Sequence, residues 1–517
     1  MSPTKRGKTP YITLDYWSFL FVTQTFLNIN QKSEIKDLLM SADKHLQSWQ
    51  ERFEMAEAMQ PLLGKLYRNQ GVEVVVYGKP LLNASTIEII KSHRLVRRHV
   101  GEKLRLRESF PFIEALSKLA VKQCKVDIGK LAVNYWREYP DASQIEAYMS
   151  RELADAITQE DTEEARDVVL YGFGRIGRLL ARLLIERTGV SNKLRLRAIV
   201  LRGGRKGDLE KRASLLRRDS VHGPFNGSVE VDEENNAIIA NGTYIQVIYA
   251  NSPDEVDYTK FGISNALVVD NTGIWKDEAG LGLHLKSPGV SKVLLTAPAK
   301  GAIKNVVYGV NESDILDEDK IVSAASCTTN AITPILKAVN DKYGIVNGHV
   351  ETIHSYTNDQ NLIDNYHSAD RRGRSAPLNM VITETGAAKA VSKALPVLEG
   401  KLTGNAIRVP TPNVSMAIIS LNLNGETNKH DMNEYLKDMA LQSDLQNQID
   451  YTDSTEIVSS DLVGSRYAGV LDSQATIAEG NRTILYVWYD NEFGYSCQVV
   501  GVMQKMLNLN YQSLPVG

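Results

Sequence analysis

Cysteine is scarce in this sequence, whose 517 residues include three thiols at Cys124, Cys327 and Cys497. Three widely separated cysteines are too few for a disulfide framework or for a zinc site built from thiolates. Such sparse use of cysteine is typical of a reducing compartment. We therefore expect a cytoplasmic protein without a bound metal ion.

An excess of one charge and long apolar runs are also lacking. The formal net charge is -3, and the basic stretch at 94–107 is interpreted as a solvated helix face. No overall basic field therefore favours nucleic acid or an anionic membrane as a partner. The apolar stretch at 16–29 contains Thr, Gln and Asn and is too short to cross a bilayer. We expect neither a signal peptide nor a membrane anchor, and Met40 is an alternative start.

Hydrophobic residues make up 43% of the chain, enough for roughly three domains at this length. Apolar residues spaced three and four apart predict a helix at 38–66, capped by Ser41 or Asp43. The segments 71–100 and 110–136 are interpreted as mainly helical, and 151–167 as a helix followed by a linker. Residues 1–165 therefore form a mostly helical region without a motif that indicates chemistry.

The periodicity changes at about residue 166. A short β-branched run there is followed by the glycine turn GFGRIG and by a helix that we expect to end at Gly189. Further buried strands at 193–204, 265–273 and 291–301 close on small or polar residues, which predicts a doubly wound parallel sheet of the α/β class. After Cys327 longer mixed strands, at 348–357 and 414–424, predict an α+β domain.

The glycine turn has the spacing of a dinucleotide fingerprint, with glycines at 172, 174 and 177. Gly172 permits the tight turn, Gly174 lets the backbone approach a pyrophosphate, and Gly177 allows the helix to pack closely on the strand. The acidic residue that normally binds the ribose of NAD is missing, and Arg202 follows the second strand instead. An arginine there either accommodates the 2′-phosphate of NADP or is a solvated loop residue.

Cys327 lies among helix-capping residues in the stretch SCTTN, which suggests a thiol at a helix N-terminus. That position, with a nearby imidazole, would lower the thiol pKa and supply a nucleophile. His354, on the strand HVETIHSYT, would be its partner and proton acceptor. From the residues alone, a buried structural cysteine remains equally open, and a lone histidine is more often structural than catalytic.

The ordered motifs GFGRIGR, SCTTN, YTNDQ, TGAAKAV, RVPTPNVS and WYDNEFGYS strongly resemble those of phosphorylating glyceraldehyde-3-phosphate dehydrogenases. The resemblance runs from about residue 166 to the C-terminus. It implies a Rossmann domain at 166–326, a catalytic α+β domain at 327–490 and a C-terminal helix at 491–517 that returns to the Rossmann domain. The N-terminal region at 1–165 has no counterpart in ordinary members, although some long bacterial relatives look similar.

In the mechanism that this resemblance implies, Cys327 attacks the substrate aldehyde and His354 acts as the general base. Loss of hydride to the nicotinamide leaves a thioester, and inorganic phosphate attacks it to give an acyl phosphate. The implied phosphate ligands are Ser326, Thr328, Thr357, Arg371, Thr385, Gly386 and Arg408. The implied cofactor contacts are Gly172, Phe173, Gly174, Arg175, Ile176, Gly177, Arg202, Thr272, Gly273, Asn491 and Tyr495.

The resemblance also implies a homotetramer, in which a loop at about 357–380 packs near a neighbouring cofactor. Ala331 stands where many relatives have a second cysteine, which removes one route to an inactivating disulfide. The cofactor is expected to be NAD or NADP. Two alternatives remain open, an erythrose-4-phosphate dehydrogenase and an assembly or regulatory protein whose N-terminal region docks a protein partner.

Overall fold

The structure is a computed structural model that describes residues 29–101, 103–158, 164–187, 189, 192–204, 206–509 and 511–515. Side chains in the first helix are described from residue 43 onward, and those of residues 98 and 99 are not. The alternative start at Met40 is not tested by the fold, and the apolar stretch at 16–29 lies almost entirely outside the described residues. Within the described residues no helix is both long and apolar enough to span a bilayer.

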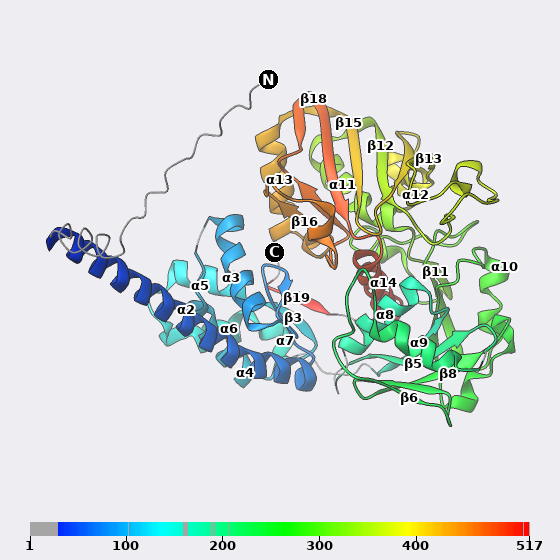
Figure 1. The fold of residues 1–517 in the computed structure, drawn as a ribbon, viewed down its shortest axis with the longest axis horizontal. Coiled ribbons are helices and arrows are strands. Elements are labelled where there is room, and N and C mark those ends of the chain that lie inside the picture. Colours follow the sequence, from blue (N-terminus) through cyan, green and yellow to red (C-terminus); the bar gives the residue numbers. More distant parts are fainter. Residues whose placement is uncertain are drawn as a thin grey trace, which may run out of the picture.

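Three sheets organise the described chain, and each has its own helices (Figure 1). An N-terminal module, residues 29–158, packs helices around a small sheet. A large mixed sheet follows, and then a seven-stranded sheet with helices on one side. The α/β class with a helical N-terminal region, expected from the sequence, is confirmed.

The N-terminal module is mainly helical but also contains strands that the sequence interpretation missed. Its helices are α2 (Ile29–Gln70), α3 (Thr86–Val100), α4 (Leu106–Lys118), α5 (Ile128–Glu138), α6 (Ile145–Glu152) and α7 (Ala154–Thr158). Its strands are β1 (Glu73–Val76), β2 (Lys79–Pro80) and β3 (Cys124–Asp127). The β-branched run in β1 is fully paired and largely buried, so its strand preference outweighed the helical interpretation. The expected cap at Ser41 or Asp43 is wrong, because α2 already begins at Ile29.

The last strand of the chain, β19 (Gln512–Leu514), belongs to the sheet of the N-terminal module. It pairs in parallel with β3, and Leu514 is buried in the apolar core of the module. Figure 1 shows this red strand among the blue and cyan elements. The module is therefore built from both ends of the described chain. It is more than an extension added at the N-terminus.

We expect Leu514→Asp to destabilise the N-terminal module. Leu514 is 4% exposed, and burying a carboxylate in its place removes apolar packing and leaves a charge without a partner. The free energy of unfolding should fall by about 3 kcal/mol or more, measured in urea. Leu46→Asp is the matched control, because Leu46 is 57% exposed on α2. Equal stability of the two variants would contradict a structural role for β19.

The second sheet has the doubly wound topology expected from the sequence. Its strands are β4 (Arg166–Tyr171), β5 (Leu194–Leu201), β6 (Val229–Asp232), β7 (Ala237–Ala240), β8 (Thr243–Tyr249), β9 (Ala266–Asp270), β10 (Val290–Leu295) and β11 (Ile321–Ser323). The order is β11-β10-β9-β4-β5-β8-β7-β6, so the chain reverses its winding direction on either side of β4. Ligands bind at the carboxyl ends of the strands at such a reversal.

Helices α8 (Arg175–Glu186), α9 (Asp208–Arg217) and α10 (Glu278–Leu281) accompany this sheet. Helix α8 ends before the expected Gly189, with Arg187 as its last half-helical residue. The C-terminal helix α14 (Phe493–Met506) packs against α8, and its apolar residues are part of the same core.

The third sheet runs in the order β13-β14-β12-β15-β18-β17-β16. Its strands are β12 (Ile345–Ser355), β13 (Val381–Glu384), β14 (Leu402–Val409), β15 (Ser415–Asn428), β16 (Ile449–Thr452), β17 (Gly469–Asp472) and β18 (Ile477–Tyr489). Its helices are α11 (Cys327–Tyr343), α12 (Ala387–Ala394) and α13 (Lys429–Gln442). Helix α11 follows β11 of the second sheet directly, so its first turn lies where the two sheets meet.

Candidate active site

Cys327 is the first residue of α11. Ser326 is the N-cap, and its Oγ accepts a hydrogen bond from the Thr329 backbone N–H at 3.1 Å. Ala325, just before it, has φ of 54°, and the Tyr495 hydroxyl donates to its carbonyl at 3.0 Å. A left-handed alanine is strained and persists only when the surroundings hold it. Helix cap and tyrosine together fix the position of the thiol.

His354 brings an imidazole to the thiol from the neighbouring strand β12. Its Nε2 lies 3.6 Å from the Cys327 Sγ, and its Nδ1 lies 2.7 Å from the Ser355 carbonyl oxygen. The Arg408 Nη1 also lies 3.2 Å from this Nδ1, but the carbonyl is closer and can only accept. We therefore assign the proton of a neutral ring to Nδ1, which leaves the lone pair of Nε2 facing the thiol. The geometry is that of a base that can take the thiol proton.

Burial has a strong effect on both groups of this pair. It raises the pKa of the Cys327 thiol, while the Arg408 charge and hydrogen bonds at the start of α11 lower it. Burial and the Arg408 charge lower the pKa of the His354 imidazole to about 3. Both shifts favour the neutral thiol and the neutral imidazole, whereas the sequence predicted a lowered thiol pKa. Loss of hydration outweighs the helix N-terminus here.

Arg408 lies beside His354 because the two residues are register partners on the parallel strands β14 and β12. Its Nη1 donates to the Ser355 carbonyl at 3.0 Å and to the Thr357 hydroxyl at 2.9 Å. The Arg408 Nε is buried and has no hydrogen-bond partner among the described residues. A guanidinium and a hydroxyl next to the thiol form a site suited to a phosphate group.

Arg372, rather than the expected Arg371, lies at this site. Its Nη1 donates to the Asp359 carboxylate at 2.7 Å, and its charge lowers the pKa values of both His354 and Arg408. Arg371 is exposed, one residue earlier in the same short 3-10 turn. The sequence DRRGR offers three arginines in four positions, so only the turn geometry decides which one points inward. The expectation for Arg371 is corrected to Arg372.

The other expected phosphate ligands divide into two groups. Gly386 is the N-cap of α12, and the Thr385 hydroxyl accepts a hydrogen bond from the Ala387 N–H at 3.2 Å. This helix start offers backbone N–H groups to an anion. Thr328 is different, because it is 4% exposed and its hydroxyl contacts Tyr489 at 3.0 Å. Its side chain holds α11 against β18, and only its backbone is left for a ligand.

The glycine turn after β4 has the shape that a dinucleotide needs. Gly172 has φ of 95°, and a Cβ atom on Gly177 would lie 2.3 Å from the Gly172 carbonyl oxygen. A side chain at either position would therefore disrupt the turn. A Cβ on Gly174 would meet nothing within 4 Å, so that side of the turn is open. Phe173 is 3% exposed and packs into the core, whereas Ile176 is half-buried on α8.

Other expected cofactor residues lie at the carboxyl ends of the adjacent strands. Thr272 and Gly273 follow β9, where the Asp270 carboxylate accepts hydrogen bonds from the Thr272 N–H and hydroxyl. Arg202 is exposed directly after β5, in the place where the ribose is bound in dinucleotide folds. Asn491 is 6% exposed, and its Oδ1 accepts a hydrogen bond from the Ser415 hydroxyl at 2.9 Å, which leaves its amide N–H₂ to donate.

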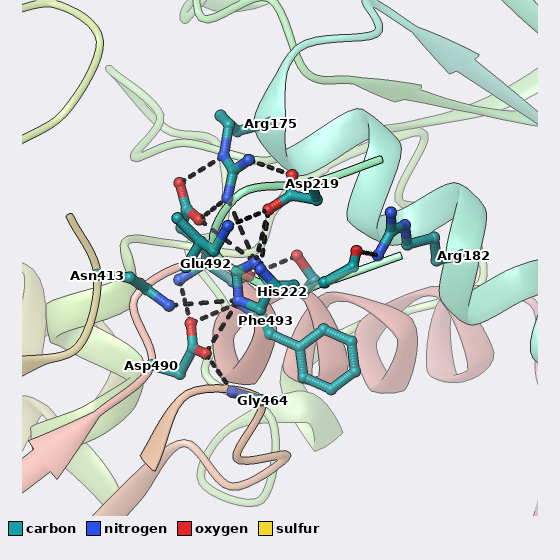
Figure 2. Close-up of polar contacts among 12 residues, drawn as sticks. Arg175, Arg182, Asp219, His222, Asn413, Gly464, Asp490, Glu492 and Phe493 are labelled. Atoms are coloured by element: carbon teal, nitrogen blue, oxygen red, sulfur yellow. Dashed lines mark hydrogen bonds and ion pairs between the residues drawn. The ribbon is translucent and has the colours of Figure 1, made fainter. Parts of the chain in front are cut away.

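Arg175 of the glycine turn joins the two large sheets through a cluster of charged residues (Figure 2). Its guanidinium is paired with Asp219 and with Glu492, the residue after Asn491. The His222 Nε2 lies 3.1 Å from the Asp490 carboxylate and 3.3 Å from the Asn413 amide nitrogen. The cluster thus holds both flanks of Asn491. Arg175 therefore connects the glycine turn to the segment that carries Asn491.

Arg408→Gln should slow alkylation of Cys327 by iodoacetamide at pH 8 by about tenfold. The nearby guanidinium charge lowers the pKa of the thiol, so its removal leaves less thiolate at a given pH. The rate is measured by mass spectrometry of the Cys327 peptide. Arg374→Gln is the control, because Arg374 is exposed and pairs with Asp364 at 2.9 Å. An unchanged rate in Arg408→Gln would refute this electrostatic effect.

Two known protein-family domains match the segments that form most of the two large sheets. Residues 166–278 match the family described as the NAD binding domain of glyceraldehyde 3-phosphate dehydrogenase. Residues 326–491 match the C-terminal domain of the same enzyme. The NAD expectation is thereby confirmed, whereas NADP rests on Arg202 alone and stays a prediction. Within the described residues no cluster of three or more metal-binding side chains occurs.

Individual relatives extend this match. A "glyceraldehyde-3-phosphate dehydrogenase-like protein" of Pseudomonas aeruginosa is 61% identical over 461 residues, which covers 88% of this chain and 100% of that protein. The glyceraldehyde-3-phosphate dehydrogenase of Zymomonas mobilis is 40% identical over 66% of this chain and 98% of its own length. Glyceraldehyde-3-phosphate dehydrogenase 1 of Bacillus subtilis is 40% identical over 64% and 96%, respectively. On these matches, the chain belongs to the glyceraldehyde-3-phosphate dehydrogenase family.

Proposed function

We propose that this protein oxidises D-glyceraldehyde 3-phosphate with NAD and inorganic phosphate to give 1,3-bisphosphoglycerate, in a reversible reaction. The observation that carries the proposal is the Cys327–His354 pair at 3.6 Å, with Arg408 directly beside it. A thiol, an imidazole and a guanidinium thus lie together between the two large sheets, which supports the roles of nucleophile, base and phosphate ligand for them. The relatives that match most of this sequence bear the name of the same enzyme.

In the first step Cys327 Sγ attacks the aldehyde carbon while His354 Nε2 takes the thiol proton. The lone pair on Nε2 is available because Nδ1 donates to the Ser355 carbonyl. The product is a hemithioacetal on Cys327. His354, now protonated, donates a hydrogen bond to the oxygen of this adduct and stabilises its developing charge.

NAD, when bound, supplies the hydride acceptor for the adduct carbon. The glycine turn and the start of α8 would hold its pyrophosphate, and the free amide N–H₂ of Asn491 would bind the nicotinamide carboxamide. Oxidation of the adduct leaves a thioester on Cys327. Inorganic phosphate attacks this thioester, and the thiolate leaves to be reprotonated by His354.

Two anion sites serve this chemistry. Arg408 and Thr357 would bind the phosphate group of the substrate, since both already point to one position. Ser326, Thr385 and Gly386 would bind the attacking phosphate, with N–H groups from the start of α12. The corrected Arg372 would add a positive charge beside Arg408. In the substrate-free protein Asp359 neutralises Arg372, so an incoming phosphate replaces this carboxylate.

We also propose that the protein assembles as a homotetramer through the loop that the sequence suggested at about 357–380. Large apolar side chains are exposed in and beside this loop. They are Leu362, Ile363, Tyr366, Leu378, Met380 and Ile382, with exposed fractions of 55 to 90%. An apolar patch of this kind is typical of a protein interface. Light scattering of the purified protein tests the proposal, and a monomer at micromolar concentration would refute it.

The enzymatic proposal is tested by the absorbance of reduced nicotinamide with glyceraldehyde 3-phosphate, with and without inorganic phosphate. We expect phosphate-dependent turnover with NAD. Parallel assays with NADP show whether Arg202 binds a 2′-phosphate. Oxidation of erythrose 4-phosphate alone would instead support the alternative dehydrogenase, and no turnover with either aldehyde would support an assembly or regulatory role.

A further inference from the structure

A cavity of about 160 Å³ lies where the N-terminal module meets the two large sheets. Its walls come from β1 and β3, from the chain after α8, from the segment before β16 and from α14. The side chains that matter here are Glu73, Lys125, Arg187, Gln448, Arg466 and Cys497. None of them belongs to the candidate active site. The cavity exists only because the N-terminal module docks on the dehydrogenase core.

The charges that the described residues place around this cavity do not cancel. Lys125, Arg187 and Arg466 are positive, and Glu73 is the carboxylate in the lining. Arg466 is also held by Glu186, outside the lining, through two contacts of 2.6 and 2.7 Å. Three positive and two negative charges leave an excess of one positive charge. A partly buried charge without a counter-ion costs hydration energy, and a bound monoanion would offset this cost.

The ionisation states of Glu73 and Cys497 agree with this excess of one positive charge. Burial raises the pKa of Glu73, but Lys125, Arg187 and Arg466 lower it more, so the carboxylate is ionised. Burial raises the pKa of the Cys497 thiol to about 11, so the thiol is neutral. Lys125 Nζ donates to the Asn447 Oδ1 at 2.8 Å, which is an uncharged partner. Lys125 also stabilises the Glu73 carboxylate through space, but among the described residues it forms no ion pair, so a ligand can still contact it.

Gln448 adds a polar group without a partner. Its side chain is 2% exposed, lines the cavity, and has an Oε1 atom with no hydrogen bond among the described residues. Gly309 makes room for this amide, because a Cβ there would lie 2.6 Å from the Gln448 Cδ. A hydroxyl group both donates and accepts, so it satisfies the amide in either orientation.

The size of the cavity limits the ligand. Its volume is close to that of engineered cavities of about 150 Å³ that accept benzene, and well below drug-sized pockets of roughly 300 Å³ or more. We propose that the cavity binds a small hydroxylated monoanion of about three or four carbons, with its negative group at Lys125 and Arg187 and a hydroxyl at Gln448. This binding site is separate from the proposed dehydrogenase activity.

Isothermal titration of the full chain with D-glycerate tests this site, because D-glycerate is a three-carbon hydroxycarboxylate without a phosphate group. We expect one saturable site per chain. Lys125→Met should weaken binding by about tenfold or more, and Lys125→Arg should retain it because the positive charge remains. The thermal midpoint of the wild-type protein should also rise with D-glycerate, since a ligand that binds only the folded state stabilises it.

Arg408→Gln is the control for the active site, and it should bind D-glycerate as tightly as the wild-type protein. Displacement by inorganic phosphate in that variant would show that the cavity accepts oxyanions in general, and failure to displace would restrict it to carboxylates. Both results support the proposal. Absence of saturable binding, or equal binding by Lys125→Met with an unchanged melting temperature, would overturn it. Loss of binding in Arg408→Gln would also overturn it, because D-glycerate would then occupy the active site.

Discussion

Cys327→Ser is expected to lower kcat/KM for phosphate-dependent oxidation by on the order of 10⁴-fold or more, since a covalent nucleophile is lost. A serine hydroxyl has no ionised form at neutral pH that could replace the thiolate. The side chain differs by one atom and lies at the start of α11, so the fold should be retained. Stopped assays with NAD, glyceraldehyde 3-phosphate and inorganic phosphate measure the loss.

The thermal melting temperature of Cys327→Ser serves as its control, and it should match that of the wild-type protein. NAD should still bind to the variant, because the glycine turn and Asn491 lie on other elements. Activity within tenfold of the wild-type rate would exclude Cys327 as the nucleophile. Loss of both activity and thermal stability would instead indicate a packing defect, and Cys327→Ala would then be compared.

His354→Asn is expected to lower kcat by about 10² to 10⁴-fold, because no base remains at the thiol. An asparagine amide can still donate to the Ser355 carbonyl, so the strand geometry should persist. The effect should be larger on kcat than on KM, since His354 acts on the reacting atoms. Alkylation of Cys327 should also slow at neutral pH, because its proton acceptor is missing.

His349→Asn is the matched control on the same strand. His349 is partly exposed, and its Nδ1 lies 2.8 Å from the Thr403 hydroxyl, away from the thiol. Its substitution should leave kcat unchanged. An equal loss in both variants would mean that β12 is disturbed as a whole and that His354 has no special role.

Part of this molecule could be predicted from local patterns. The glycine turn lies between a buried strand and an apolar-spaced helix, and its backbone has the conformation that this spacing requires. Cys327 begins a helix as its capping neighbours indicated. These features depend on residues close in the chain, so the sequence pattern and the structure describe the same interactions.

Other features could not be predicted because they join distant residues. Strand β1 looks like part of a helical region until β2 and β3 pair with it. Strand β19, which pairs with β3, comes from the opposite end of the chain. The choice of Arg372 over Arg371 depends on a turn that places one side chain next to Asp359. The neutral state of the Cys327–His354 pair depends on burial by two sheets, which no local pattern contains.

The sequence by itself determined the family, the doubly wound sheet and the motifs that carry the thiol and the imidazole, since these follow from motifs and periodicity. The tertiary structure alone decided how the N-terminal module is attached, which arginine faces the thiol, and where a cavity with excess positive charge forms. The physical reason is that charge balance, burial and strand pairing are properties of residues that meet in space, and they exist only after the chain has folded.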